Sequence, residues 1–554
     1  MSRSRTLVLL LFVAGVAAHA AWMAEWVAAD ERVSGSICCD LSGPVVDLVV
    51  SERTGYRTPL SPWRLHDRGG MSWLAFAVSE VQGGFSPDTL LWTQMLALGA
   101  AQAAMLWALW PIAGPWGALA AALCLPLLPG IAFAARSWAP FTIQSALLIV
   151  SLGAAVRGLD RLRWAAVLVV TGFLGASTSR LITDDLLFVQ SLGLMLAASV
   201  IAAAVHGQTA TARRVSRWRL ALGTLLTAGL MLGAIAHAFS PRGDVRFHLS
   251  YYAEELGVQA SEQAPTYASL ADPRSAEALM AYPRRLSNYE VGVLWTGLLL
   301  LALPGFVLRG RGRAALLTGG LGPLLILTLV AKKQIFYVYL ILPFIPAFVA
   351  IGLVGPLRRR PRAAAVAAAL LVGVAVWGID TDKPPPGSSQ GTVRQWQRAV
   401  FQFPYPLTLY PQVRTEAGGS EAYLSAVLPQ SCPSPLGLVV LDNDLHGALG
   451  GEPELAARLK IVLAEAGMCV SLYRQLPDDG TAPAVLWVGG DRSGSCQVSA
   501  EQPWSAAWAQ AYRALDWAVV DQRTLADGRC RTLLVRDDSR WLGLIRDNVA
   551  ALSD

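Results

Sequence analysis

Long apolar runs dominate the first two thirds of the sequence and predict membrane-spanning helices. A helix needs about 20 apolar residues to cross a bilayer, and most of the runs approach that length. The first covers about 7–29, and ten more follow at about 88–110, 116–135, 139–156, 164–179, 185–206, 218–239, 289–308, 314–331, 334–354 and 363–380. Allowing for one or two further crossings within the loops, we predict an α-helical polytopic membrane domain over residues 1–380 with about 11–13 transmembrane helices.

The first run has two interpretations. Arg3 and Arg5 precede it, and Ala-His-Ala at 18–20 resembles the end of a cleavable signal peptide. The apolar character continues to residue 29, which is longer than most signal-peptide cores and favours an uncleaved anchor. Both interpretations place residue 30 outside the cytosol.

The arginine clusters predict the topology of the membrane domain. If the N-terminus is inside, every dense cluster falls on the cytosolic face, as the positive-inside rule requires. The clusters are Arg157, Arg161 and Arg163; Arg213, Arg214, Arg217 and Arg219; Arg309, Arg311 and Arg313; and Arg358, Arg359, Arg360 and Arg362. With this topology, four segments lie on the outer side of the membrane: the loop 30–87, a turn at Arg136, a loop near 240–288 and everything after about 381.

The last third of the chain has a different pattern. A Pro/Gly/Ser-rich linker at 381–395 leads to residues 396–554, which we expect to form an extracytoplasmic α/β domain. Predicted strands lie at 436–441, from 469, from 484, at 519–520 and at 533–535, with an amphipathic helix at 452–466. An even set of cysteines in this region indicates disulfides if it faces an oxidising compartment: Cys432, Cys469, Cys496 and Cys530.

Composition supports a membrane protein and argues against a nucleic-acid-binding protein and a metal-binding protein. Of the 554 residues 54% are hydrophobic and 15% are charged, whereas soluble chains have about a quarter charged. The net charge of +6 is explained by arginines that orient the helices, so we predict no nucleic-acid partner. There is no Cys-x-x-Cys pair or His-rich stretch, and therefore no metal site is predicted.

Candidate chemistry lies in the outer loop 30–87, the first long polar interruption. It holds acidic residues and a histidine at the water boundary, where charge avoids the desolvation cost of the bilayer core: Asp30, Glu31, Asp40, Asp47, His66 and Asp67. The apolar residues after Asp40 suit a short helix lying at the membrane surface. A carboxylate held between that helix and the bundle could act as a general base. The alternative is that each acidic residue is a solvated loop carboxylate.

Two outer-boundary lysines, Lys332 and Lys333, go against the usual charge bias and suggest an anionic ligand. Their alternative role is interfacial snorkelling, which also applies to Arg136. Three further features have weaker functional interpretations: a charged segment with Arg180, Asp184 and Asp185, the 240–288 loop as a lid over the acceptor, and Asp442-x-Asp444, for which turn capping is favoured over a metal site.

Four stretches together resemble the GT-C superfamily of polyprenyl-phosphate-sugar-dependent glycosyltransferases, which includes protein O-mannosyltransferases and the lipid A aminoarabinose transferase. They are CDLSGPVVDLVVSE through Asp40, HDRGGMSWLAFA through His66, AFAARSWAPF through Arg136, and KKQIFYVYLILPFIPAFVAIGL. Two departures are clear. Asp-Leu stands at Asp40 where the family has Asp-Glu, a pair found instead at Asp30, and Asp-Arg follows His66 in place of Pro-Pro.

The resemblance implies a membrane glycosyltransferase that moves a sugar from a polyprenyl-phosphate carrier to a lipid, glycan or protein acceptor, with inversion and without a cofactor. It implies Asp40 as the base, with Asp30 as the alternative, and His66 as the second catalytic residue. Substrate contacts are expected from Asp67, Arg136, Lys332, Lys333 and Tyr337. The enzyme would work in the cell envelope, on the outer side of the plasma (inner) membrane.

The alternative function is that of a polytopic transporter or envelope-assembly scaffold with an outer partner-binding domain. Transporters often contain internal repeats and place charges near the membrane midplane. The sequence has no internal repeat, and its acidic residues gather in the outer loop. Both observations favour the enzyme.

Overall fold

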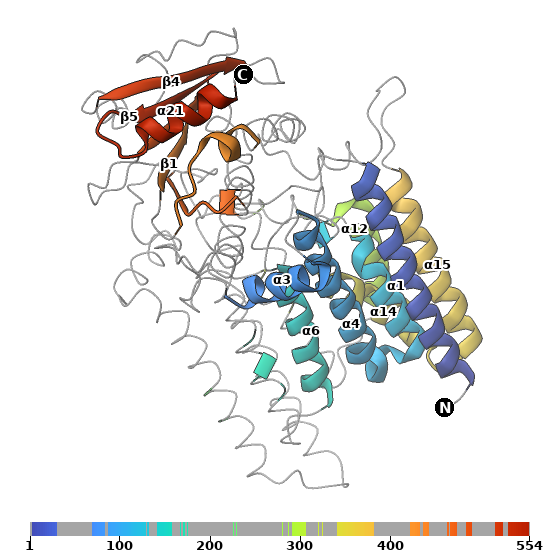
Figure 1. Cartoon of the computed structure of the whole chain (residues 1–554). Coiled ribbons are helices and arrows are strands. Elements are labelled where there is room, and N and C mark those ends of the chain that lie inside the picture. The colour runs from blue at the N-terminus through green and yellow to red at the C-terminus, as the bar shows by residue number, and fades with distance from the viewer. Residues whose placement is uncertain are drawn as a thin grey trace. The chain divides into compact units, whose positions relative to one another are not determined.

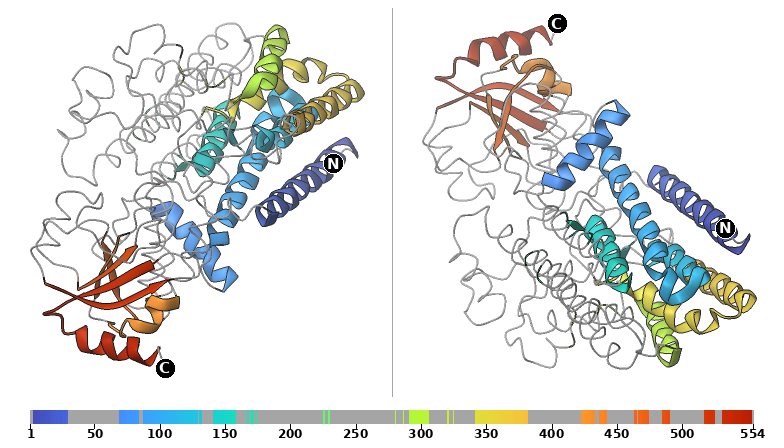
Figure 2. Two further views of the ribbon diagram at one scale, coloured as in Figure 1. Left: turned by 90° about the horizontal axis from the view of Figure 1, so that it is seen from above. Right: turned by 90° about the horizontal axis from the view of Figure 1, so that it is seen from below.

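The structure is a computed structural model in which two compact units are described (Figures 1 and 2). The helical unit comprises Met1–Trp26, Arg64–Met71 and Asp88–Gln402, and the second unit comprises Val27–Trp63, Ser72–Pro87 and Phe403–Asp554. The described residues are 3–29, 69–83, 87–128, 130–131, 141–157, 291–305, 341–381, 422–432, 436–441, 463–464, 466–473, 484–489, 516–524 and 530–552, with ten isolated positions between 167 and 324.

Two helices of the described part are long and apolar enough to cross a membrane. The first stretch, Ser4–Ala21, has a mean hydropathy of 1.7 and lies in α1 (Arg3–Ala29); the second, Trp92–Leu127, has a mean hydropathy of 1.5. Apolar side chains of α1 such as Leu10 and Val13 point outward, as they do on a helix that meets lipid. The predicted total of 11–13 helices stays a prediction.

Helix α4 (Pro87–Cys124) is a helical hairpin rather than one straight rod. Gly114 has φ 75° and interrupts it between Pro111 and Pro115. The Gln102 side-chain amide donates to the carbonyl of Ala122 at 3.1 Å, although 20 residues of continuous helix would separate them by about 30 Å. The two halves therefore run antiparallel, which agrees with the separate apolar runs predicted at 88–110 and 116–135.

Shorter apolar helices complete the described part of the helical unit. They are η1 (Leu125–Leu127), α6 (Phe141–Arg157), α12 (Gly292–Ala302) with η4 (Leu303–Gly305), α14 (Phe344–Leu353) with η6 (Gly355–Leu357), and α15 (Pro361–Thr381). These coincide with the runs predicted at 139–156, 289–308, 334–354 and 363–380. The runs predicted at 164–179, 185–206, 218–239 and 314–331 lie outside the described residues, apart from isolated positions.

Helices α12 and α14 lie side by side in close backbone contact (Figure 1). A Cβ atom added to Gly352 of α14 would lie 2.3 Å from the carbonyl oxygen of Ala302. Only glycine fits there, since small residues allow membrane helices to approach closely.

The second unit contains most of helix α3 (Gly69–Gln82), from Ser72 onward, and a five-stranded sheet. The strands are β1 (Leu436–Leu441), β2 (Val470–Tyr473), β3 (Val485–Gly489), β4 (Trp517–Thr524) and β5 (Cys530–Arg536), in the order β2-β1-β3-β5-β4. β1 is parallel to β2 and β3, whereas β5 is antiparallel to β3 and β4. All five predicted strands are therefore present.

One face of the sheet packs against helices to form the core of this unit. Helix α21 (Leu542–Ala551), which was not expected from the sequence pattern, lies beside the sheet (Figure 1). It contributes Ile545 and Val549 to the core. A short helix at 422–427 adds Leu424 and Val427, and Leu533 of β5 belongs to the same core. Of the helix predicted at 452–466, residues 463 and 464 are described as helical.

Disulfides stabilise the second unit, as its cysteines predicted. Cys432 is bonded to Cys469, which directly precedes β2, and Cys530 is also disulfide-bonded. Ser431 strengthens the first bridge because its hydroxyl accepts a hydrogen bond from the Cys469 amide at 3.0 Å. Cys124, by contrast, is a free and buried thiol of the helical unit.

Candidate functional site

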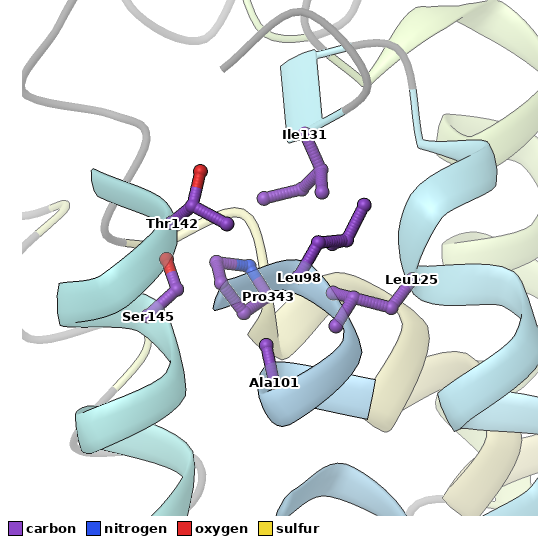
Figure 3. A pocket seen from close by; sticks show the side chains of 7 residues that line it. All are labelled: Leu98, Ala101, Leu125, Ile131, Thr142, Ser145 and Pro343. Atoms are coloured by element: carbon purple, nitrogen blue, oxygen red, sulfur yellow. The ribbon is translucent and has the colours of Figure 1, made fainter. Parts of the chain in front are cut away.

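A small pocket lies among α4, η1, α6 and the residue before α14 (Figure 3). Its volume of about 10 Å³ is at the lower limit for one water molecule. Five apolar residues and two hydroxyl residues line it: Leu98, Ala101, Leu125, Ile131 and Pro343, with Thr142 and Ser145.

The pocket lies near the N-terminus of α6, away from two arginines of the predicted cytosolic clusters. Arg157, at the C-terminus of α6, donates to the carbonyl of Trp107 at 2.7 Å, close to the turn of the α4 hairpin. Arg358 reaches the same turn, because a Cβ atom on Gly114 would lie 3.2 Å from its Cβ. Thr142 stands 15 residues before Arg157, about 22 Å along the helix. The two arginines thus share one end, as the topology prediction requires.

The start of α6 presents buried polar groups that have no hydrogen-bond partner among the described residues. Thr142, Gln144 and Ser145 are 4%, 0% and 3% exposed. Neither hydroxyl nor either amide atom of Gln144 has a hydrogen-bond partner within the described part of the chain. The turn also has the positive dipole end of a helix N-terminus. Hydropathy alone did not reveal these three residues, because they fall inside the apolar run 139–156.

The site residues predicted from the sequence all lie outside the described residues. They are Asp40, His66, Asp67, Arg136, Lys332, Lys333 and Tyr337. Their assignments therefore stay predictions. Along the chain, however, Arg136 falls between two lining residues, Ile131 and Thr142, and the segment with the lysines and Tyr337 leads to a third, Pro343.

Comparison with solved structures identifies the architecture. ArnT from Cupriavidus metallidurans, solved bound to undecaprenyl phosphate, aligns over 95% of this chain and 97% of its own with a TM-score of 0.54 and 12% identity. The chain has the GT-C fold. The same enzyme in the apo state aligns over 93% of this chain and 98% of its own, with a TM-score of 0.50 and 12% identity.

The sequence matches no protein-family model and no curated protein. The likeness is therefore one of structure, and it covers both the helical unit and the second unit, which we call the C-terminal unit below. Membrane helices followed by a further domain agree with the GT-C fold that the four sequence stretches predicted. Among the described residues, no group of three His, Cys, Asp or Glu side chains is placed to hold a metal.

Proposed function

We propose that this protein is an integral membrane glycosyltransferase that transfers a sugar from a polyprenyl-phosphate carrier to a lipid, glycan or protein acceptor on the outer side of the membrane. The observation that carries the proposal is the GT-C fold shared along nearly the whole of both chains with a structure solved with undecaprenyl phosphate. Because fold alone does not fix function, the proposal also needs the chemistry of the residues.

The position of the pocket supports a lipid-phosphate site at the outer end of the helical unit. Arg136 is five residues from Ile131, so its Cα lies within about 18 Å of that lining residue. Tyr337 is six residues from Pro343, a limit of about 22 Å. Chain connectivity thus limits how far both segments can lie from one end of the bundle, the end remote from Arg157 and Arg358.

The predicted cations suit a phosphate at the membrane surface. An arginine holds phosphate oxygens bidentately, whereas lysine acts as a point charge. Arg136, Lys332 and Lys333 would neutralise the phosphate of the carrier and stabilise it as the leaving group when the sugar departs. Tyr337 and Asp67 would contribute hydrogen bonds to the substrates.

The acidic residues of the outer loop supply the base. Asp40 would take the proton from the acceptor hydroxyl or amine as that atom attacks the anomeric carbon, with Asp30 as the alternative base. His66, in the same loop, would be the second catalytic residue. Attack from the face opposite the departing phosphate inverts the anomeric configuration, and no metal is needed in this scheme.

Disulfides support an extracytoplasmic position for the C-terminal unit. The bridge between Cys432 and Cys469 is of a kind that persists in oxidising compartments and is rare in the cytosol. Placing this unit outside agrees with the predicted topology, in which everything after about 381 lies beyond the plasma membrane.

The experiment is complementation of a deletion strain, with cell-surface glycans and lipids analysed by mass spectrometry. Wild-type protein should restore a glycosylated product that Asp40→Asn does not restore, although the variant is present in the membrane at equal amount. Asp47→Asn, in the same loop, is the matched control and should restore it. Asp30→Asn decides between the two candidate bases. Full restoration by both Asp30→Asn and Asp40→Asn would remove these carboxylates from the mechanism.

A further inference from the structure

The buried polar residues at the start of α6 differ from three hydroxyl residues elsewhere in the helical unit, Thr93, Ser151 and Thr296. Ser151 on the same helix donates to the Leu147 carbonyl at 2.9 Å and meets the Thr171 hydroxyl at 2.7 Å. Thr93 and Thr296 each donate to the carbonyl four residues earlier, at 2.7 and 2.8 Å. Bonding of this kind is the ordinary way in which a helix satisfies a buried hydroxyl.

The first turn of α6 does not follow that pattern. Ser145 makes no bond to the carbonyl of Phe141, and the Thr142 hydroxyl and both amide atoms of Gln144 also have no partner in the described part of the chain. Each group is at least nine-tenths buried, so water does not compensate for it freely. Buried polar groups without partners destabilise a fold, and such departures concentrate where a protein binds a ligand.

Thr142 and Ser145 lie next to the pocket, and Gln144 lies farther around the helix and does not line it. Viewed down the helix axis, Ser145 lies about 60° and Gln144 about 160° from Thr142 in the same direction. Thr142 and Ser145 line the pocket, and Figure 3 shows both hydroxyl oxygens directed toward the N-terminal end of α6. Opposite them stand apolar side chains, including Leu98, Leu125 and Pro343.

The identity of the unpaired atoms restricts the ligand. Gln144 offers a donor, Nε2, next to an acceptor, Oε1, and neither has a partner in the part of the chain that the structure describes. A phosphate ionised at neutral pH offers acceptors almost alone and would leave Oε1 without a donor. Two neighbouring hydroxyl groups can donate and accept together, and they satisfy both amide atoms at once. The serine and threonine hydroxyls have the same dual capacity.

We infer that the first turn of α6 binds the hydroxyl groups of the transferred sugar, with Gln144, Thr142 and Ser145 as specificity-determining residues. This rests on the proposed function and assigns to the sugar a set of contacts separate from the cations that would hold the phosphate. The pocket in this structure has room for about one water molecule. A sugar therefore reaches these atoms only when the apolar wall opposite them moves aside.

The test compares the same substitution at two buried serines of one helix. Ser145→Ala removes an unpaired hydroxyl, whereas Ser151→Ala removes one with two hydrogen bonds. The full-length proteins are purified, and their melting temperatures are measured without substrate. Ser145→Ala should melt at or above the wild-type temperature, and Ser151→Ala below it. Gln144→Leu should behave as Ser145→Ala does.

The second measurement is transfer activity, with the lipid extract of the deletion strain as the probe because unused donor accumulates there. Ser145→Ala should raise the KM for the donor about three- to tenfold, the loss expected for one neutral hydrogen bond. Gln144→Leu should raise it further. Ser151→Ala should leave the activity per folded molecule unchanged. All variants should bind undecaprenyl phosphate, which has no sugar, as wild type does.

The outcomes separate this inference from the proposed function. Wild-type transfer with unchanged KM in Ser145→Ala and Gln144→Leu overturns the sugar contacts and leaves the glycosyltransferase intact. A melting temperature that falls in Ser145→Ala as far as in Ser151→Ala also overturns them, since the hydroxyl would then be bonded in the resting protein. Absence of any transfer by wild type overturns the proposed function, and this inference with it.

Discussion

Arg157 packs its guanidinium over the indole ring of Trp107, with 3.8 Å between Cζ and the ring centroid. The same guanidinium donates to the carbonyl of Trp107 at 2.7 Å and to that of Gly153 at 2.9 Å. One side chain thus fastens the C-terminus of α6 to the first half of the α4 hairpin. Cations near helix C-termini are favourable in any case, and here the planar fork and the ring add to that effect.

Replacing this arginine by lysine should weaken the helical unit although the charge is kept. Lysine cannot reproduce the fork that bonds two carbonyls while stacking on the ring, and a hydrogen bond from a charged donor contributes about 1.5–3 kcal/mol. We expect Arg157→Lys to lower the free energy of unfolding of the purified protein by about 2 kcal/mol, and therefore to lower its melting temperature. Arg359→Lys, at an exposed position, is the matched control and should stay within about 0.5 kcal/mol of wild type. Equal melting of the two variants would contradict the prediction.

The shared position of Arg157 and Arg358 at one end of the helical unit predicts which end faces the cytosol. By the positive-inside rule this end is cytosolic. A cysteine introduced by Arg359→Cys should react with a membrane-impermeant maleimide only after the membrane is permeabilised. Asp538→Cys, 68% exposed in the C-terminal unit, should react in intact spheroplasts. The reverse result would invert the topology and place the outer-loop chemistry on the wrong side for the proposed function.

How much of this fold the sequence predicted depends on whether a local pattern carries the information. The apolar run at 139–156 predicted α6, and the break between the runs at 88–110 and 116–135 predicted that α4 is two helices rather than one. Strand β1 was predicted from the continuous run of apolar residues at 436–441. Helix α21 was missed because Arg546, Asp547 and Asn548 dilute its apolar positions.

The candidate site was harder to predict for a related reason. Thr142, Gln144 and Ser145 are invisible in an average over an apolar run, and only burial and hydrogen bonding distinguish them from Ser151. Conversely, Asp40 and Lys332 were noticed because charge is conspicuous beside apolar helices. Their contacts depend on residues far apart in the sequence, and no local pattern specifies such contacts.

The contact between α12 and α14 predicts a difference between two helical glycines. Gly352→Ala would place a methyl group 2.3 Å from the Ala302 carbonyl oxygen, and relieving such overpacking costs about 1–3 kcal/mol. Gly373→Ala on α15 meets nothing within 4 Å and should be neutral or stabilising by up to about 1 kcal/mol. Melting temperatures of the two variants in detergent check this. A stable Gly352→Ala protein would mean that the helices are farther apart than described.

The disulfide between Cys432 and Cys469 should contribute substantially to the C-terminal unit. It closes a loop of 37 residues, for which the chain-entropy relation gives about 4 kcal/mol. Cys432→Ser with Cys469→Ser should therefore speed hydrogen exchange in β1 and β2, which follow the two cysteines. Cys124→Ala, which removes a free thiol, is the control and should leave exchange in these strands unchanged. Identical exchange in the double variant and wild type would show that the core alone holds these strands.

Tyr423 predicts how the C-terminal unit responds to high pH. Its hydroxyl donates to Asp521 Oδ2 at 2.5 Å, and Arg523 lies 4.6 Å from its ring centroid and 3.3 Å from the same carboxylate oxygen. Burial, then the hydrogen bond and the charge of Asp521, raise the pKa of Tyr423 well above its usual value. The folded state therefore holds the phenol proton more tightly than the unfolded state does. This contribution is present below about pH 10, the unfolded pKa, and is lost progressively as the pH rises further.

Tyr423→Phe removes the hydrogen bond to Asp521 and, with the phenol, the pH dependence that this group gives to the free energy of unfolding. Near pH 7 the variant should be less stable than wild type by about 1–3 kcal/mol, because Asp521 loses its phenolic donor. Above about pH 10 the wild-type advantage should shrink, since only the wild type has a phenol whose deprotonation favours unfolding. Hydrogen exchange at 422–427, measured for both proteins from pH 7 to 11 and corrected for intrinsic rates, gives the difference directly. A constant difference over that range would show that the phenol proton is not linked to folding, and the hydrogen bond to Asp521 would then need another explanation.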